Sequence, residues 1–305
     1  MAKIYAMAGY VATIGMFDGV HLGHQFVLHH VVETAREQGL LSMAVTFDRH
    51  PRQVLQPAWH PQLLLTADEK LKQLQATGVD RVEVLCFDAA MARLSAQTFM
   101  QQVLKEQLGV SVLLMGYDNR FGSRREDSFD DYVAYGRQVG IEVVRASQWT
   151  ADGQVPCSSL IRQKVTDGEV REAALLMGHP YTLSGTIVHG RRIGHSIGFP
   201  TANLQPYSPD KIVPRSGVYA VTAQVDDDDK VLKGMMNIGM RPTFDGHHQT
   251  LETHLFDVDA DLYDHQLTVT FVDRLRDEQP FPDAEALVQQ MNQDKQQAIE
   301  ILKTI

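Results

Sequence analysis

Two histidines in a glycine-rich stretch are the first candidates for chemistry in this chain. Residues 15–24 read GMFDGVHLGH, and His21 and His24 are three residues apart, about one helical turn, so both rings can point to one side. Paired imidazoles suit the binding of a phosphate and the stabilisation of charge that develops on it. Gly15, Gly19 and Gly23 keep the stretch bare, so that a bulky anion can approach the backbone.

The residues around this stretch predict how it is held. The apolar run Val11 to Ile14 is typical of a buried strand, and Val27, Val31 and Ala35 recur at helical spacing within residues 25–38. The motif therefore lies on a turn where a strand leads into a helix, whose free N–H groups and dipole face the same anion. The alternative is that both histidines are solvated loop residues, which the strand–turn–helix context disfavours.

Strand and helix patterns alternate through the first half of the chain. The expected strands are 41–47, 81–87, 110–115 and 141–145, and the expected helices are 66–78, 95–108 and 128–138. Such alternation predicts a parallel sheet with helices on both faces, in which ligands bind beyond the carboxyl ends of the strands. Asp48 and His50 follow one of these strands, before Pro51 stops regular structure, and Asp118 to Phe121 follow another.

The pattern changes after a short helix at 168–177, which is broken by Gly178 to Tyr181. We place a domain boundary there, with domains 1–180 and 181–305. The second domain has strand-like runs separated by turn signals, at 184–189, 217–225, 231–238, 251–256 and 267–272. This spacing predicts an antiparallel barrel, and residues 283–302 predict a terminal helix packed on it. The expected fold class is therefore α/β followed by a β-barrel.

A second candidate site lies between residues 185 and 203. Gly185, Gly190 and Gly194 interrupt strand-like sequence, which weakens a strand unless something must approach its backbone closely. Thr201 and Asn203 place two neutral oxygens on one side of an extended segment. A hydroxyl and an amide oxygen suit Mg²⁺, which also keeps phosphate and water ligands.

Composition excludes several classes of function. The chain has 305 residues and a formal net charge of −10, which disfavours nucleic acid and anionic membranes as partners. Its two cysteines, Cys86 and Cys157, are far apart, so a disulfide framework and a cysteine zinc site are not expected. Cys86 lies in an apolar run and is expected to be buried. A signal peptide and a membrane-spanning stretch are not expected either, which favours the cytoplasm.

Several stretches, in order along the whole chain, resemble one family. The G-x-F-D-G-V-H-x-G-H stretch resembles the nucleotidyltransferase signature and, more narrowly, the start of bacterial FAD synthetases, the bifunctional riboflavin kinase/FMN adenylyltransferases. Cys157 to Arg162 is similar to the S-S-T-x-I-R motif of that family, with Ser158 or Ser159 able to cap a helix. The second half contributes G-F-P-T-A-N at 198–203, N-I-G-M-R-P-T-F at 237–244 and L-E-T-H-L-F-D at 251–257. Arg276, Glu278 and Phe281 fit the R-x-E-x-F segment of the family.

The resemblance implies a Rossmann-like domain that adenylylates FMN to FAD with release of pyrophosphate, and a barrel that phosphorylates riboflavin to FMN with ATP. It implies catalytic roles for His21, His24, Arg162 and Glu252, the last as the base for the flavin ribityl hydroxyl. It implies Mg²⁺ ligation by Thr201 and Asn203. The implied ATP-binding residues are Gly15, Phe17, Asp18, Gly23, Ser158, Ser159, Gly185, Gly190, Gly194 and Thr201, and the implied flavin-binding residues are Asp48, His50, Asp118, Asn119, Arg276 and Phe281.

The chain departs from the family pattern at a few positions. Met16, Arg49, Asn119 and Glu126 replace the usual Asn, Pro, Phe and Gly of the first domain, near where FMN is expected to bind, and His195 and Asp264 are departures in the second. Two alternatives therefore stand beside the bifunctional enzyme: a riboflavin kinase whose first domain is degenerate or adenylylates another acceptor, and a flavin or nucleotide sensor without turnover. The catalytic residue types at both sites disfavour the sensor. The oligomeric state stays open.

Overall fold

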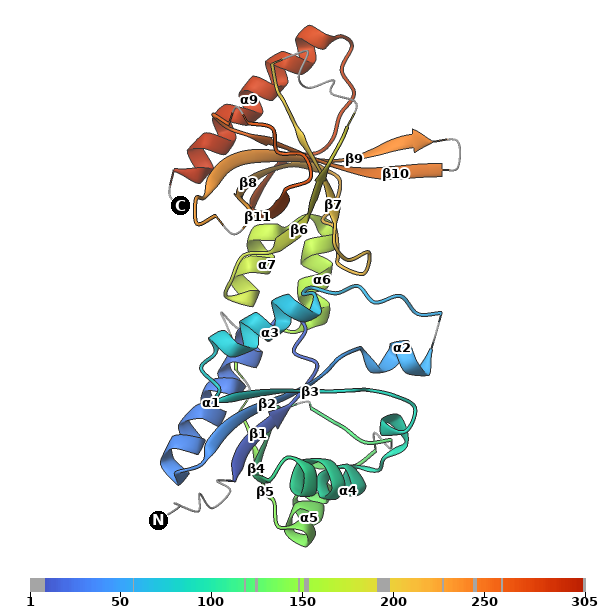
Figure 1. The fold of residues 1–305 in the computed structure, drawn as a ribbon, viewed down its shortest axis with the longest axis vertical. Coiled ribbons are helices and arrows are strands. Elements are labelled where there is room, and N and C mark those ends of the chain that lie inside the picture. The colour runs from blue at the N-terminus through green and yellow to red at the C-terminus, as the bar shows by residue number, and fades with distance from the viewer. Residues whose placement is uncertain are drawn as a thin grey trace. The chain divides into compact units, whose positions relative to one another are not determined.

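The computed structural model describes residues 9–56, 58–117, 119–123, 126–147, 149–150, 154–190, 198–226, 228–243, 246–258 and 260–303, with the side chains of 241–243 and 246–248 left out. Within these residues the chain forms two compact units, Met1–Ser158 and Ser159–Ile305 (Figure 1). Among the described helices, none is long and apolar enough to cross a membrane.

The first unit is built on a parallel sheet of five strands in the order β3-β2-β1-β4-β5. Its strands are β1 (Tyr10–Ile14), β2 (Leu41–Phe47), β3 (Arg81–Leu85), β4 (Val110–Met115) and β5 (Glu142–Arg145). Its helices are α1 (Leu22–Gln38), α2 (Pro51–Leu55), α3 (Ala67–Ala76), the 3₁₀ turn η1 (Met91–Arg93), α4 (Ala96–Phe99), the π-type helix η2 (Met100–Gln107) and α5 (Phe129–Val139). The expected parallel sheet is confirmed.

Alternation along β1 explains why helices cover both faces of this sheet. Ala12 and Ile14 pack into a core with residues of α4, η2 and α5, whereas Val11 packs with Val31 and Ala35 of α1. Successive side chains of a strand point to opposite faces, so a central strand that is apolar throughout needs cover on both sides. Figure 1 shows α1 and α4 on opposite faces of the sheet.

The second unit is a closed six-stranded barrel in the order β10-β7-β6-β11-β8-β9, in which neighbouring strands are antiparallel. Its strands are β6 (Thr182–Val188), β7 (Ala202–Pro206), β8 (Gly217–Val225), β9 (Leu232–Thr243), β10 (Gly246–Leu255) and β11 (Gln266–Arg276). Its helices are α6 (Ser158–Asp167), which begins at the boundary, α7 (Val170–Met177) and the terminal α9 (Ala284–Leu302). Ala298 and Leu302 of α9 pack on Val218, Ala220 and Met235 of the barrel, as expected.

Two expectations from the sequence are wrong. Cys86 is exposed rather than buried, because β3 ends at Leu85 and is an edge strand of the sheet. Pro51 begins a helix instead of only ending regular structure: it occupies the first turn of α2, where its missing N–H costs nothing, and His50 caps that helix. The strand β7, which carries Asn203, was not among the expected strands.

Candidate active sites

The turn after β1 lies at the switch point of the parallel sheet. β2 and β3 extend the sheet on one side of β1, and β4 and β5 extend it on the other, so the connections after β1 and β4 leave in opposite directions. Ligands of open α/β sheets bind beyond the strand ends at such a point. The side-chain amide of Asn119, after β4, donates to the carbonyl of Ile14 at the end of β1. The two connections therefore meet where a ligand is expected.

The backbone of this turn is strained. Phe17, Gly19 and Val20 have φ values of 50°, 86° and 34°, and a β-branched residue such as Val20 rarely adopts a positive φ. Strained backbone of this kind persists only where surrounding contacts hold it, and it concentrates at functional sites.

Hydrogen bonds to neighbouring segments hold the turn. The carboxylate of Asp18 accepts from the amides of Leu64 at 3.0 Å and Leu65 at 3.2 Å. The hydroxyl of Ser158 donates to the carbonyl of Asp18 at 2.8 Å, and the side-chain amide of Gln25 donates to that of Val20 at 2.8 Å. Asp18 and Ser158 thus shape the turn, whatever contacts they make with a nucleotide.

His21 and His24 stack on each other at the start of α1. Their ring centroids are 3.6 Å apart with an interplanar angle of 20°, and the Nδ1 of His21 accepts from the amide of His24 at 3.3 Å. Because that Nδ1 accepts, the neutral ring of His21 carries its proton on Nε2. The Nδ1 of His24 is buried and has no hydrogen-bond partner within the described part of the chain. Burial, followed by the nearby His21, holds the pKa of His24 well below its ordinary value. His24 is therefore a neutral imidazole at pH 7.

A cavity of about 290 Å³ opens beside the turn. Its walls include Met16, Phe47 and Phe87, and its polar lining includes His50 and Asn119. Asp118 lies outside the described residues. The cavity has the aromatic and apolar walls that a planar ring system requires.

Asp48 does not line that cavity. Its carboxylate accepts from the amide of Phe87 at 2.9 Å and from the guanidinium of Arg49 at 3.0 Å, and it faces a separate hollow shared with Arg49 and Gln53. Burial raises the pKa of Asp48, but these hydrogen bonds outweigh burial and place the pKa below its usual value. Asp48 thus links the segments that follow β2 and β3. His50 caps α2 and lines the other cavity, beside Asn119.

The remaining residues assigned to the first site lie at the start of α6. Ser158 is the first residue of that helix, Ser159 is exposed, and Arg162 is half-buried on the same helix in the second unit.

In the barrel, strand register brings the second set of residues together. Glu252 of β10 pairs with Asn203 of β7 on one side and with Asn237 of β9 on the other. Directly paired residues point to the same face of a sheet, so the Glu252 carboxylate and the Asn203 amide are neighbours. Glu252 and Thr201 line one cavity of about 270 Å³, together with Arg276 and Phe281. Four of the residues selected from the sequence therefore share one hollow.

His254 is a residue of this cavity for which the sequence suggested no role. Its Nδ1 lies 2.8 Å from the carbonyl of Pro200, to which it donates, so it fixes the segment before Thr201 to the strand that carries Glu252. Burial lowers the pKa of His254, and this outweighs the bond to Pro200. The signal was its position two residues after Glu252, which places both side chains on one face of a strand.

Arg276 is held by an ion pair inside the barrel unit. Its guanidinium donates to both oxygens of Asp294 of α9, at 2.9 Å and 2.7 Å, and Asp294 is 2% exposed. The guanidinium also lies 5.7 Å from the ring centroid of Phe281. Arg276 therefore attaches α9 to β11 and positions Phe281 at the cavity.

Two glycines of the second candidate site allow neighbouring segments of the chain to approach their backbone closely. A Cβ on Gly190 would lie 2.7 Å from Cγ of Asn203, and a Cβ on Gly185 would lie 2.6 Å from the backbone carbon of Gln205. Gly185 thus lets β7 pair closely with β6, and Gly190 leaves room for the Asn203 side chain. Gly194 lies outside the described residues.

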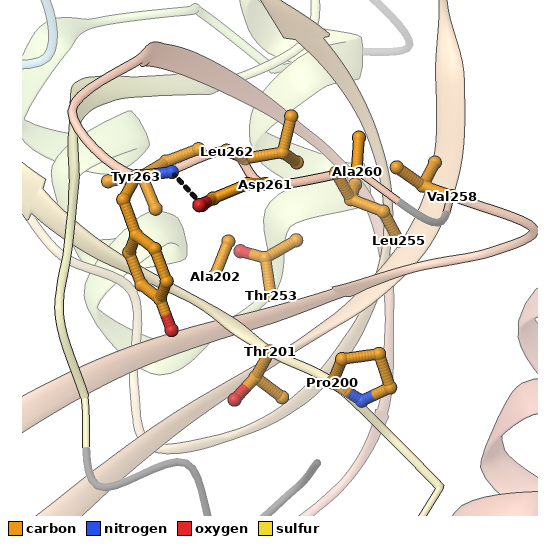
Figure 2. Close-up of a pocket in the computed structure, with 11 residues that line it drawn as sticks. Pro200, Thr201, Ala202, Thr253, Leu255, Val258, Ala260, Asp261, Leu262 and Tyr263 are labelled. Atoms are coloured by element: carbon orange, nitrogen blue, oxygen red, sulfur yellow. Dashed lines mark hydrogen bonds between the residues drawn. The ribbon is translucent and has the colours of Figure 1, made fainter.

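Thr201 lines a second cavity as well. This hollow, of about 320 Å³, is lined by Ile187, Ala202, Thr253 and Leu255, and by a loop with Asp261 and Tyr263 (Figure 2). The two cavities of the barrel unit therefore share Thr201, with Glu252 in the first and Thr253 in the second.

Comparisons with known proteins agree with this arrangement. A family profile described as FAD synthetase matches residues 4–160, and one described as riboflavin kinase matches residues 177–302. Curated proteins named bifunctional riboflavin kinase/FMN adenylyltransferase are 37% identical in Escherichia coli K12 and 39% identical in Pseudomonas fluorescens, each covering 94% of this chain and 91% of the relative.

One solved structure matches both units. It is titled a macrolide-efflux protein from Streptococcus pneumoniae, with a TM-score of 0.87 and 31% identity, and the match covers 96% of this chain and 95% of that one. With the curated relatives matched over nearly their full length, the chain belongs to the family of bifunctional riboflavin kinase/FMN adenylyltransferases.

Proposed function

We propose that this protein makes FAD from riboflavin in two steps. The barrel transfers the γ-phosphoryl group of ATP to riboflavin, which gives FMN and ADP, and the parallel-sheet domain transfers AMP from a second ATP to FMN, which gives FAD and pyrophosphate. The observation that carries the proposal is that Thr201 lines two cavities of the barrel, one of which also contains Glu252. Two adjoining cavities of this kind can hold the phosphoryl donor and the acceptor on either side of Thr201.

The lining of each cavity supports its assignment. The cavity with Glu252 contains an aromatic side chain, Phe281, against which a flavin ring can stack. The cavity with Thr253 is mainly apolar, which suits a nucleobase with its phosphates directed to Thr201. Glu252 then lies where it can accept the proton of the ribityl hydroxyl as its oxygen attacks the γ-phosphorus and ADP leaves.

The donor set at Thr201 and Asn203 fits Mg²⁺. Both residues offer neutral oxygens, and Asn203 is paired with Glu252. Mg²⁺ needs few protein ligands because it keeps phosphate and water oxygens. When bound there, it supplies positive charge to the nucleotide phosphates; Thr201 and Asn203 orient them and Gly190 leaves room for Asn203.

In the first domain, a phosphate oxygen of FMN attacks the α-phosphorus of ATP and pyrophosphate leaves. The Nε2–H of His21 and the ring of His24 are available to hydrogen-bond phosphate oxygens as charge develops on them, together with the N-terminal amides of α1. A flavin in the cavity beside Asn119 places its phosphate near this turn. Arg162 and Ser159 serve as further phosphate ligands in this proposal.

The proposal also covers the domain boundary, the binding partners and the cellular location of the protein. We assign adenylyl transfer to residues 1–180 and phosphorylation to 181–305, which places α6 and α7 with the first activity although they belong to the second compact unit. The partners are small molecules, and the net charge of −10 supports the exclusion of nucleic acid. We propose a cytoplasmic location, because both reactions consume ATP and the first consumes riboflavin.

The test is to incubate the purified protein with riboflavin, ATP and Mg²⁺ and to resolve the flavins by chromatography over time. We expect FMN to rise first and FAD to follow, with pyrophosphate released in step with FAD. FMN without FAD would restrict the activity to the kinase. Unchanged riboflavin would overturn the proposal.

A further inference from the structure

The hydroxyl of Thr253 is buried and has no hydrogen-bond partner among the residues that the structure describes. Thr253 is 0% exposed, and its Oγ1 is one of two buried side-chain polar atoms without a partner among the described residues. A buried hydroxyl without a partner destabilises the folded protein, and most such groups in native proteins are paired. This hydroxyl is therefore a candidate for a partner that is not part of the chain.

Strand alternation directs Thr253 away from the catalytic cavity. Glu252 and His254 on either side of it line the cavity assigned to the flavin, whereas Thr253 lines the other cavity. Its backbone pairs with Ala202, the residue after Thr201. Paired strands are about 4.8 Å apart, so Thr253 lies one strand spacing beyond the Thr201 segment.

The walls around Thr253 in this cavity include several apolar side chains, and hydrogen bonds within the chain hold the loop that forms one wall. Ile187, Ala202 and Leu262 line the walls, and Figure 2 shows Thr253 beside Ala202 and below the loop of Leu262. Two backbone hydrogen bonds fix that loop to β6, from Asp264 to Ile187 and from Ile187 to His265, each 2.9 Å long. The carboxylate of Asp261 accepts from the amide of Tyr263 at 3.2 Å, within the loop itself.

We propose that the Thr253 hydroxyl is a nucleotide-binding residue of the kinase reaction, and that it hydrogen-bonds the heteroaromatic edge of the ATP base. This inference rests on the proposed function of the barrel. A base whose phosphates lie at Thr201 extends along Ala202 toward Thr253. Its faces contact Ile187 and Leu262, and a ring nitrogen accepts from the hydroxyl. The hydroxyl, which has no partner among the described residues, is then paired in the complex.

Two substitutions isolate this hydrogen bond. Thr253→Val keeps the shape and removes the hydroxyl, and Thr253→Ser keeps the hydroxyl. For riboflavin phosphorylation by the full-length protein, we expect the Val variant to raise KM for ATP by about five- to tenfold, the loss of one net hydrogen bond, with kcat and KM for riboflavin within about twofold of the parent. The Ser variant should return KM for ATP toward the parent value.

Two readouts separate this role from a structural one. FMN adenylylation by the same Val variant uses the other domain, so its KM for ATP should equal that of the parent. Thermal unfolding of the Val variant should not occur at a lower temperature, because no intramolecular hydrogen bond is lost. A variant that unfolds earlier and loses both activities would overturn the inference.

Direct binding tests the inference without turnover. Titration of the parent with MgADP should show two sites, of which the Val variant weakens one by about five- to tenfold and leaves the other unchanged. If the parent does not phosphorylate riboflavin but this titration behaves as expected, the proposed function fails, whereas the contact between Thr253 and the nucleotide base stands. If phosphorylation is normal and the Val variant changes neither ADP binding nor KM for ATP, the Thr253 inference alone fails. A rise in KM for riboflavin instead would mean that the cavity holds the flavin, and would also overturn it.

Discussion

In the parallel-sheet unit His21 and His24 lie on a single turn, whereas in the barrel Asn203 and Glu252 come from strands far apart in the sequence. His21 and His24 are placed by a strained backbone, and hydrogen bonds from Leu64 and Leu65 hold that turn. Glu252 and Asn203 are placed by the register of β10 against β7.

The turn after β1 and the paired strands β7 and β10 are sensitive to different changes in sequence and conditions. A turn can place its groups within a few residues, but it stacks two imidazoles and buries His24, which disfavours protonation of that ring. Paired strands place the Asn203 amide and the Glu252 carboxylate on one face of the sheet. This arrangement depends on the close approach of neighbouring segments, as at Gly190. The predictions below test that contrast.

The largest effect is expected from Glu252→Gln in the barrel. Removal of the proton acceptor should slow riboflavin phosphorylation by about 10²–10⁴-fold, because general-base catalysis contributes that much. Folding and flavin binding should be retained, since Gln has the same size. Glu285→Gln, which changes an exposed carboxylate on α9, should leave the rate unchanged. A Glu252→Gln variant that phosphorylates at the parent rate would remove this residue from the mechanism.

His24→Ala should slow FMN adenylylation by about 10²-fold, because one preorganised donor to a developing charge contributes that much. Riboflavin phosphorylation should stay near the parent rate. His29→Ala, at an exposed position of the same helix, is the matched control and should affect neither reaction. Equal loss of both activities in His24→Ala would argue against separate sites.

Gly190→Ala tests the close approach in the barrel. The new Cβ would lie 2.7 Å from Cγ of Asn203 and displace that side chain. A displacement of about 1 Å in a positioning group can cost up to about 10²-fold, and we expect a loss of roughly 10- to 10²-fold in riboflavin phosphorylation. FMN adenylylation in the same variant is the internal control. Full kinase activity would show that Asn203 does not position a phosphate or a metal.

Asn119→Phe tests the departure from the family pattern in the first unit. An aromatic side chain at the cavity should add stacking of about 1 kcal/mol, which lowers KM for FMN in adenylylation by roughly fivefold. It should also destabilise the unit by about 1 kcal/mol, because the Ile14 carbonyl loses its donor. Asn119→Ala should show the loss of stability without the gain in affinity. An unchanged KM for FMN would place the flavin elsewhere.

The smallest effect concerns pH. The pKa of His24 is below its ordinary value of 6.5, so the unfolded chain binds more protons than the folded chain in acid. The free energy of unfolding of the first unit should therefore be unaffected by this group above pH 6.5 and should fall as the pH drops below it. His24→Gln should reduce that slope in denaturant unfolding measured between pH 7 and pH 5. Equal slopes would mean that His24 titrates normally in the folded protein.

The sequence predicted regular elements best where burial alone decides them. The bounds of β2, β4 and β8 agree with the expected ranges, because each is an apolar run in a central position, ended by glycine or a polar turn. β7 was missed because only Leu204 of its residues is buried, so it has no alternating pattern and is defined by its neighbours β6 and β10.

The candidate sites could be predicted only in part. Short motifs gave the residue types, but not the directions in which their side chains point. Asp48 and His50 are two residues apart in one motif, yet they line different hollows, because Asp48 bonds to Arg49 and to the amide of Phe87 whereas His50 caps α2. The hydroxyl of Thr253, which has no partner among the described residues, gives no sequence signal, because its surroundings depend on the strands and loops that pack around β10.

The most direct test of two separate sites is a mixing experiment. Riboflavin, ATP and Mg²⁺ are supplied to His24→Ala alone, to Glu252→Gln alone, and to an equimolar mixture, and the flavins are resolved by chromatography. We predict FMN without FAD from the first variant, little FMN from the second, and FAD from the mixture, because FMN released by one variant is adenylylated by the other. A mixture that makes no more FAD than either variant alone would contradict this account.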